Sequence, residues 1–162
     1  MSNEKTKLPE TRPRPNQSIR SLVEKDSFPM ALGVSFGHIG PGYAEAALTI
    51  REDMLNFAGV THGGVIFALA DTVFGAASNA YGETALAIHA DISFLRATKT
   101  GDVLTARAVE AFRRGRLTHV RVTVADAGGR LVALFQGVAN IKQDSRAGRG
   151  READSSFSSM RP

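Results

Sequence analysis

The chain has 162 residues, of which 43% are hydrophobic and 22% are charged, a balance typical of a soluble globular domain and not of a disordered chain. It contains no cysteine, which excludes disulfide bonds, thiolate metal sites and a cysteine nucleophile. We find neither a secretory signal nor a run of about 18 apolar residues, and therefore expect one cytoplasmic domain that does not cross a membrane.

The formal net charge of +4 is carried by the two ends of the chain. Residues 1–26 contain six Lys or Arg against four Asp or Glu, residues 142–162 contain five against three, and the residues between contain nine of each. The ends are also rich in Pro, Ser and Gly, and such segments cannot bury enough apolar surface to offset their conformational entropy. We therefore expect disordered tails over 1–26 and 143–162, a folded domain over 27–142, and no nucleic-acid surface.

The folded part begins with two predicted strands. Strand-like apolar patterns occur in Ala31–Phe36 and Tyr43–Ile50, and the turn sequence Gly40-Pro41-Gly42 separates them, which predicts a β-hairpin. The pattern then changes, because the stretch 63–80 is rich in Ala and apolar nearly all round, as in a helix that is buried on most sides. Gly82 follows it, at a position where glycine commonly ends a helix.

Extended segments joined by short turns follow the predicted helix. They are Ala85–Leu95, Asp102–Phe112, Leu117–Ala125 and Leu131–Ile141. In the first of them, one face carries Ile88, Ala90, Ile92 and Phe94, and the other carries His89, Asp91 and Ser93. This order of elements predicts an α+β domain in which one curved sheet with antiparallel strands wraps around one long central helix.

The most informative residue is Asp71, a carboxylate in the middle of the apolar helix. An ionised carboxylate among apolar side chains is costly unless it is paired or does chemical work. One interpretation is structural, with Asp71 paired to an Arg or capping another backbone segment. The other is functional, with Asp71 as a general base or nucleophile whose basicity rises in a dry pocket.

Gly63 and Gly64 open the same helix. Glycine there can serve close backbone packing, or it can leave N–H groups at the positive end of the helix dipole open to a developing oxyanion. Asp71 lies eight residues after Gly63, about 12 Å along a helix, whereas a base and an oxyanion donor act on atoms about 3 Å away. If both are catalytic, the site combines Gly63 of one subunit with Asp71 of another, and the protein is at least a dimer.

Asn56 and His62 stand just before the helix. Asparagine between elements is most often a turn residue, but an amide near Gly63 could also orient a water molecule or polarise a carbonyl. His62 is either a structural residue at the start of the helix or a catalytic one. The remaining histidines show no metal-ligand spacing, so we expect no metal ion; they are His38, His89 and His119.

The pattern Asn56-x5-His62-Gly63-Gly64-x6-Asp71 resembles the hotdog-fold acyl-CoA thioesterases, and among them the PaaI type of phenylacetate degradation. Further motifs similar to this family are Ala68-Leu69-Ala70-Asp71-Thr72, Phe94-Leu95-Arg96, Gly101-Asp102-Val103-Leu104 and the stretch 132–137. The resemblance covers about residues 30–142. It implies a hotdog fold, two subunits whose sheets join edge to edge, active sites at that interface, and often a homotetramer built as a dimer of dimers.

The resemblance also implies roles for single residues. Asp71 would activate water or attack the thioester, and the Gly63 N–H would polarise the carbonyl. Asn56 and His62 would support them from the other subunit. In some relatives a hydroxyl holds the water at the position that His89 occupies here, so that role would fall to the His89 imidazole or to Thr72. We expect further substrate contacts from Gly64, Thr72, Phe67 and Phe74. The phosphates of coenzyme A are expected at Arg96 and at the turn formed by Arg113, Arg114 and Arg116.

Hydrolysis of an acyl-CoA is the function that these observations favour, with no cofactor besides the coenzyme A of the substrate. Phe57, Phe67, Phe74 and the many alanines indicate an apolar acyl pocket for an aryl-acetyl group, such as phenylacetyl or hydroxyphenylacetyl, or for a medium-length chain. Two alternatives stay open. One is a hotdog hydratase or dehydratase that uses His89 with Asp71, and the other is a non-catalytic acyl-CoA sensor whose basic tails contact DNA or a protein.

Overall fold

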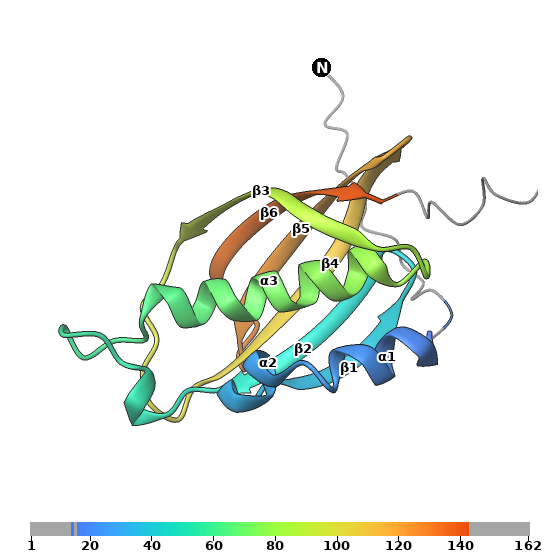
Figure 1. The fold of residues 1–162 in the computed structure, drawn as a ribbon. Helices are drawn as coiled ribbons and strands as arrows, with labels where there is room; N and C mark the ends of the chain where they lie inside the picture. Colours follow the sequence, from blue (N-terminus) through green and yellow to red (C-terminus); the bar gives the residue numbers. More distant parts are fainter. Residues whose placement is uncertain (1–13, 15, 143–162) are drawn as a thin grey trace, which may run out of the picture.

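The computed structural model describes residue 14 and residues 16–142, which form one six-stranded sheet curved around a long helix (Figure 1). Neighbouring strands are antiparallel, in the order β1-β2-β4-β5-β6-β3. The long helix is α3 (Gly63–Asn79), and the short helix η1 (Glu52–Met54) precedes it. The strands are β1 (Ser35–Gly40), β2 (Tyr43–Thr49), β3 (Ala85–Phe94), β4 (Val103–Arg114), β5 (Leu117–Asp126) and β6 (Leu131–Ile141). The predicted α+β fold with a wrapped central helix is confirmed.

Two hairpins follow directly from turn residues in the sequence. β1 and β2 meet at a turn in which Gly42 takes a φ of 67°, a conformation that glycine adopts without strain. β5 and β6 meet where the Asp126 side chain accepts hydrogen bonds from the backbone N–H groups of Gly128 and Arg130. Both predicted hairpins are confirmed.

The N-terminal boundary of the domain differs from the prediction. Helices α1 (Gln17–Val23) and α2 (Ser27–Leu32) form here, so the tail predicted over 1–26 is wrong from residue 16 on. The strand predicted at Ala31–Phe36 starts only at Ser35, because its first residues end α2. Residues 1–13, 15 and 143–162, which the sequence predicts as tail, lie outside the described residues.

Helix α1 is attached to the domain by one apolar and one polar contact. Ile19 is buried in the core, and the Asn16 side-chain amide donates a hydrogen bond to the backbone carbonyl of Ala80, just after α3, at 2.6 Å. Asn16 also caps α1, because its side-chain oxygen accepts hydrogen bonds from two backbone N–H groups of the first turn. As a result α1 and α2 both contact α3 (Figure 1).

Helix α3 has a buried side and an outward stripe. The side that faces the core is formed by Ile66, Leu69, Ala70, Val73, Phe74, Ala76 and Ala77. We call the less buried residues the outward stripe; they are Gly64, Ala68, Asp71, Thr72, Gly75 and Asn79, at the spacing of one helix face. None of the helices in the described part is both long and apolar enough to cross a membrane.

Candidate active site

The start of α3 offers one backbone donor without a partner. His62 is the N-cap, and its Nδ1 accepts a hydrogen bond from the Gly64 N–H at 2.9 Å. Among the described residues no acceptor faces the Gly63 N–H, and the ring of Phe94 lies 3.1 Å from the point where a Cβ on Gly63 would be. The Gly63 N–H, predicted as an oxyanion donor, is therefore available. The Gly64 N–H is not, because it already donates to His62. His62 caps the helix, which is the structural interpretation of this residue.

The segment from Leu55 to Thr61, which we call the 55–61 loop, projects past the N-terminal end of α3 (Figure 1). At its base Leu55 pairs with Thr61, and the hydroxyl of Thr98 donates to the hydroxyl of Thr61 at 2.7 Å. Inside the loop the Asn56 side chain accepts two hydrogen bonds from backbone N–H groups, at 2.9 and 3.3 Å. Asn56 is therefore a turn residue, and its catalytic role stays a prediction.

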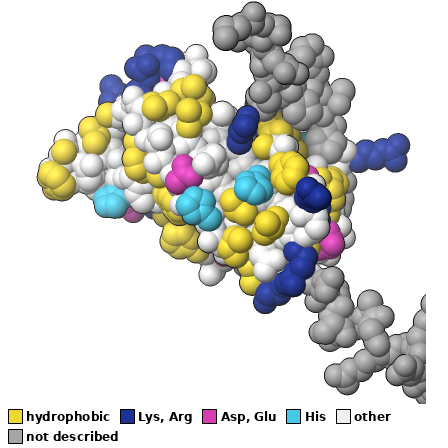
Figure 2. Space-filling view, turned by 90° about the horizontal axis from the view of Figure 1, so that it is seen from above, with side chains coloured by type: hydrophobic (Ala, Val, Ile, Leu, Met, Phe, Trp, Pro, Cys, Tyr) yellow, Lys and Arg dark blue, Asp and Glu magenta, His cyan; other side chains and the backbone are white. Residues whose placement is uncertain are grey.

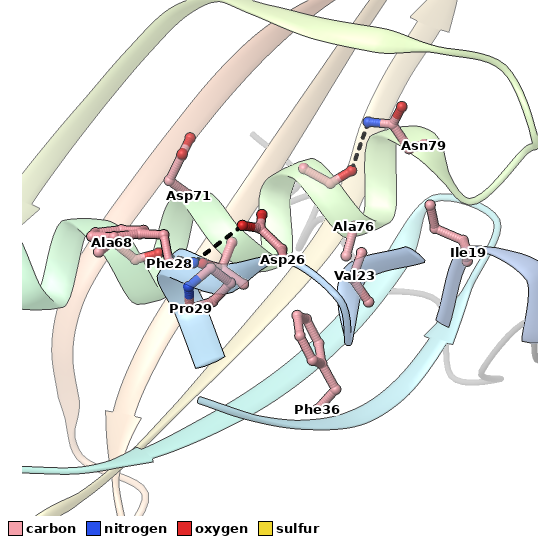
Figure 3. Close-up of a pocket in the computed structure, with 12 residues that line it drawn as sticks. Ile19, Val23, Asp26, Phe28, Pro29, Phe36, Ala68, Asp71, Ala76 and Asn79 are labelled. Atoms are coloured by element: carbon pink, nitrogen blue, oxygen red, sulfur yellow. Dashed lines mark hydrogen bonds between the residues drawn. The ribbon is translucent and has the colours of Figure 1, made fainter. Parts of the chain in front are cut away.

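Asp71 lies on the outward stripe, and its side chain is exposed in the single chain. The expectation that Asp71 is enclosed by apolar neighbours is therefore wrong for one protomer. The carboxylate has no hydrogen-bond or ion-pair partner among the described residues (Figure 3). Partial desolvation nevertheless raises its pKa above the ordinary value. The structural interpretation of Asp71, a partner Arg or a capped segment, is not supported.

A cavity of about 270 Å³ opens beside Asp71, between the outward stripe, α1, α2 and β1 (Figure 3). We call it the Asp71 pocket. Its polar lining residues are Asp26, Asp71, Thr72 and Asn79. Thr72 donates its hydroxyl proton to the Ala68 carbonyl at 2.7 Å. Most of the wall is apolar and is formed by Ile19, Val23, Phe28, Pro29, Phe36, Ala68 and Ala76.

Part of this pocket comes from a segment that the sequence predicts as a tail. Ile19, Val23 and Asp26 line the pocket and lie within residues 1–26. Neither a long apolar run nor a clear helical periodicity of apolar residues marks this segment. The available signal is the pair of capping residues, since Asn16 and Asp26 each stand directly before a helix.

Gly63 and Asp71 lie eight residues apart on one helix, so their separation along its axis is about 12 Å. A single carbonyl group cannot contact both in one protomer, because each contact spans about 3 Å. If both residues act on the same carbonyl group, the site must therefore combine Gly63 of one subunit with Asp71 of another.

The two phenylalanines predicted to contact substrate differ in burial. Phe67 is half-buried and packs edge to face on Phe135, with 5.4 Å between ring centroids. Phe74 is only 2% exposed, and its ring packs so closely on Gly137 that a Cβ there would lie 2.7 Å away. The predicted substrate contact of Phe74 is therefore wrong, because Phe74 belongs to the core between α3 and β6.

His89 is not brought together with Asp71. It lies beside Asp91 on β3, with 3.4 Å between Nε2 and Oδ2, and lines a groove of about 540 Å³ with His119 and Arg121 of β5. This groove is on the outer face of the sheet, turned away from α3. The predicted place of His89 at the water, and the hydratase alternative that pairs it with Asp71, are therefore not supported. No group of three or more metal-ligating side chains occurs in the described part of the chain.

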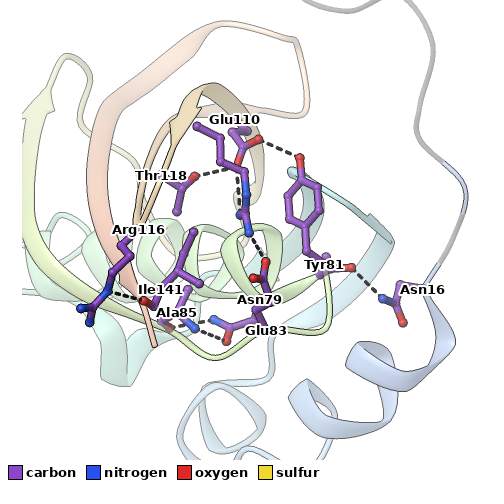
Figure 4. A network of polar contacts seen from close by, with 11 residues as sticks. Asn16, Asn79, Tyr81, Glu83, Ala85, Glu110, Arg116, Thr118 and Ile141 are labelled. Atoms are coloured by element: carbon purple, nitrogen blue, oxygen red, sulfur yellow. Dashed lines mark hydrogen bonds and ion pairs between the residues drawn. The ribbon is translucent and has the colours of Figure 1, made fainter. Parts of the chain in front are cut away.

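The arginines predicted to bind phosphate fall into two groups. Arg113 forms ion pairs with Glu83 and Glu110, and its guanidinium lies 4.0 Å from the ring centroid of Tyr81. The hydroxyl of Tyr81 donates to Glu110 (Figure 4), and burial together with this carboxylate raises the pKa of Tyr81 to about 12. Arg113 is thus engaged inside the protomer.

The other arginines are more accessible. Arg116 is exposed and donates through Nε to the Ile141 carbonyl at 3.2 Å. Arg96 and Arg114 are exposed and have no ion-pair partner among the described residues. Arg96 follows β3 at the end of the sheet where β6 begins, whereas Arg114 lies at the opposite end, beside Leu117 and the end of β6. The two arginines are therefore two separate candidate positions for phosphate.

Comparison with known proteins connects this geometry to a family. The profile of the thioesterase superfamily matches residues 58–133. The acyl-coenzyme A thioesterase PaaI of Escherichia coli is 36% identical over 122 residues, which are 75% of this chain and 86% of that protein. A putative esterase of Archaeoglobus fulgidus is 36% identical over 104 residues, 64% of this chain and 68% of that protein. The solved structure of the E. coli PaaI protein, from the phenylacetic acid degradation operon, gives a TM-score of 0.76 at 32% identity and covers 78% of this chain and 92% of that chain.

Proposed function

We propose, because this chain belongs to the thioesterase superfamily, that it hydrolyses an acyl-coenzyme A to the free acid and coenzyme A. Its likeness to PaaI makes it a hotdog-fold thioesterase of that type, and the acyl-coenzyme A substrate is the one in that relative's name. The observation that carries the proposal is on α3. An unpaired N–H at Gly63 and an unpaired carboxylate at Asp71 lie about 12 Å apart on one helix.

In the proposed site, the thioester carbonyl oxygen accepts a hydrogen bond from the Gly63 N–H of one subunit. The positive end of the α3 dipole stabilises the negative charge that develops on this oxygen. The Asp71 carboxylate of the other subunit takes a proton from water while the water oxygen attacks the carbonyl carbon. The carbon–sulfur bond then breaks, and coenzyme A leaves as a thiolate that takes up a proton.

Direct attack by the Asp71 carboxylate fits the same geometry. It would form a mixed anhydride and release coenzyme A, and water would then hydrolyse the anhydride. A single turnover in heavy-oxygen water tests for the anhydride route. Label in the Asp71 side chain indicates an anhydride opened at the Asp71 carbon, whereas label in the product acid alone fits both direct attack by water and an anhydride opened at its acyl carbon.

The surface that we propose for the dimer is the open edge of β3. Within residues 16–142 this strand pairs only with β6 and ends the sheet, and its Leu86 and Ile88 are 49% and 60% exposed. An edge strand with exposed apolar side chains is a template for pairing with another strand. Two β3 strands that pair antiparallel about a two-fold axis would join the sheets and bring the two α3 helices alongside each other.

We further propose that two dimers associate into a homotetramer through the outer face of the sheet. Hydrophobic and histidine side chains gather on the face seen in Figure 2. Exposed apolar side chains of this face include Phe112, Leu117 and Leu134, and exposed apolar patches mark contact surfaces. Sedimentation of the purified protein tests this assembly, because a dimeric mass at all concentrations contradicts it.

The acyl group in this proposal lies in the Asp71 pocket. The apolar wall and the volume of about 270 Å³ fit an aryl-acetyl group, such as phenylacetyl or hydroxyphenylacetyl, and also a medium-length aliphatic chain. Turnover across a panel of aryl-acetyl and straight-chain acyl-coenzyme A esters identifies the preferred group.

Subunit complementation tests the shared site. Gly63→Pro removes the N–H at the first helical position, where proline is tolerated, and His62 already has the extended backbone, φ −61° and ψ 132°, that a residue before proline adopts. Asp71→Ala removes the carboxylate. We expect each homodimer to lose at least about 100-fold in turnover. A mixed dimer of the two variants should regain about half of the activity per dimer, because one of its two sites keeps both groups.

The matched control is Gly63→Ala, which keeps the N–H and requires only a small displacement of the exposed Phe94 ring. It should retain much more activity than Gly63→Pro. A mixed dimer no more active than its parents, or an Asp71→Ala homodimer with full turnover, contradicts the proposal.

A further inference from the structure

Phe57, at the tip of the 55–61 loop, is fully exposed, at 105% of its reference area. The loop around it is well ordered by hydrogen bonds. The Asn56 N–H donates to the Val60 carbonyl at 2.8 Å, and the Gly59 N–H donates to the Asn56 carbonyl at 3.0 Å. Burying a phenylalanine side chain is favourable because it removes a large apolar surface from water. An ordered loop that leaves this ring in water therefore indicates a contact outside the protomer.

The Asp71 pocket has empty space beside Gly75, where α3 carries no side chain. Glycine inside a helix is less favourable than alanine, because it loses more backbone freedom on folding. A Cβ on Gly75 would meet no atom within 4 Å, so packing within this chain does not require glycine there. Gly75 lines the pocket one helical turn beyond Asp71, and the gap is open to a group from outside the chain.

Two-fold symmetry relates the loop to this gap. A dimer that sets Gly63 beside Asp71 of the partner subunit also sets Asp71 beside Gly63 of the partner subunit. The two α3 helices then run antiparallel and are centred near Phe67. In that register, the part of one chain that lies before Gly63 falls alongside the partner's α3 beyond Asp71.

The distances agree with this register. Gly75 and Asn79 lie about 6 and 12 Å beyond Asp71 along the helix. Six residues separate Phe57 from Gly63, and a chain of that length spans at most about 20 Å. Because the 55–61 loop projects past the start of α3 (Figure 1), it points along the partner's α3 toward these residues.

We propose that Phe57 of one subunit packs over Gly75 of the partner subunit, closes the far end of that subunit's Asp71 pocket, and limits the length of the acyl group. This inference rests on the proposed function, because it uses the same shared site. Phe57 is then a specificity-determining residue that acts on the acyl chain and not on the reacting carbonyl.

Two substitutions with opposite expected effects test the assignment, measured as kcat/KM for saturated acyl-coenzyme A esters from butanoyl to dodecanoyl. Phe57→Ala lengthens the pocket, so the ratio of long-chain to short-chain kcat/KM should rise about ten-fold. Gly75→Ala fills the floor of the pocket and should lower that ratio. The control is Leu131→Ala, since Leu131 is exposed at the start of β6, and it should leave the ratio unchanged. An unchanged ratio in Phe57→Ala overturns the proposal.

A mixed dimer decides which subunit supplies the ring. One chain carries Asp71→Ala and the other carries Phe57→Ala, and the mixed dimer is isolated with two affinity tags. Its one active site uses Asp71 of the Phe57→Ala chain together with the intact loop of the other chain. We expect the chain-length preference of the wild type. The preference of the Phe57→Ala homodimer would place the ring in the same subunit and overturn the proposal.

A fluorescence measurement separates failure of this inference from failure of the proposed function, because it needs no turnover. The chain contains no tryptophan, so Phe57→Trp introduces a single indole. Its emission should be blue-shifted in the dimer and return toward that of exposed indole on dilution to monomers. Emission of an exposed indole in the dimer overturns the Phe57 contact, even where acyl-coenzyme A hydrolysis and the complementation of Gly63→Pro by Asp71→Ala are both observed.

Discussion

Desolvation raises the pKa of Asp71, and this shift affects activity at low pH. A general base or nucleophile must be ionised, so kcat/KM should fall as the pH drops through the raised pKa of Asp71. We expect an acidic limb at a pH above the ordinary Asp value of 3.8. The pH profile of kcat/KM measures it. A rate that stays constant to below that value would contradict a catalytic Asp71.

The same shift affects stability in the opposite direction. A carboxyl whose pKa is higher in the folded state stabilises the fold most below its unfolded pKa, and this contribution is lost as the pH rises through the folded pKa. Asp71→Asn should therefore unfold at a higher temperature than the wild type at pH 7, with the difference shrinking below about pH 4. It should also lose at least about 100-fold in turnover. Melting curves across this pH range measure the difference in melting temperature between Asp71→Asn and the wild type. A lower melting temperature of the variant at pH 7 would contradict the prediction.

At the level of residues, the sequence predicts the free N–H of Gly63 but not the surroundings of Asp71 and Phe74. The donor at Gly63 follows from its place at a helix start. The exposure of Asp71 and the burial of Phe74 do not follow, because a helix that is apolar nearly all round does not reveal which side meets the sheet. The environment of Asp71 also depends on a second chain in the proposed dimer, and one sequence carries no direct record of that contact.

The crossing of β6 over α3 depends on the contact between Gly137 and Phe74. A Cβ on Gly137 would lie within 3 Å of three atoms of the Phe74 ring. We expect Gly137→Ala to destabilise the protein by about 1–3 kcal/mol, the usual cost of overpacking a core. Phe74→Leu in the same chain should recover part of this loss, because the two sites are in contact. Urea unfolding of the single and double variants measures the coupling, and additive effects would contradict it.

The arginines predicted to bind phosphate divide into Arg113, which is held by ion pairs, and the exposed Arg96 and Arg114. Arg113→Ala should lower stability, because it leaves Glu83 and Glu110 without their ion-pair partner. It should leave KM for an acyl-coenzyme A unchanged. Arg96→Ala and Arg114→Ala remove exposed cations and should raise KM about ten-fold with little change in kcat. Thermal unfolding and steady-state kinetics test the division, and a raised KM for Arg113→Ala would contradict it.

At the level of elements, prediction works where the signal is local. The hairpin turns and α3 are set by glycines, by Asp126 and by a long apolar run. Helices α1 and α2 are seven and six residues long, too short for a helical period to stand out from polar and proline-rich surroundings. Burial of Ile19 and the bond from Asn16 to Ala80 attach α1 to the domain, and in α2 the buried residue is Pro29. Such long-range contacts cannot be read from local composition.

On the scale of the whole molecule, several features have no partner among the residues that the structure describes. These are the open edge of β3, the exposed ring of Phe57, the carboxylate of Asp71 and the N–H of Gly63. A two-fold dimer accounts for all of them together. In the proposed dimer, Gly63 and Asp71 become neighbours, the β3 edges are covered, and the loop meets the pocket. From sequence alone, the 12 Å separation on α3 predicts a site shared by two subunits if both groups are catalytic, whereas the Phe57 contact needs the structure of the loop.

Disrupting the β3 edge should therefore abolish activity without touching either catalytic group. Ile88→Lys places a charge on the exposed edge strand, and inserted lysines are a common means of preventing edge pairing. Because Gly63 and Asp71 cannot serve one carbonyl within a protomer, we expect a folded monomer whose turnover falls at least about 100-fold. Leu131→Lys, on an exposed residue at the start of β6, is the matched control and should stay dimeric and active. Sedimentation velocity and thioester hydrolysis measured on the same samples decide the matter, since a fully active monomer of Ile88→Lys would place the whole reaction within one chain.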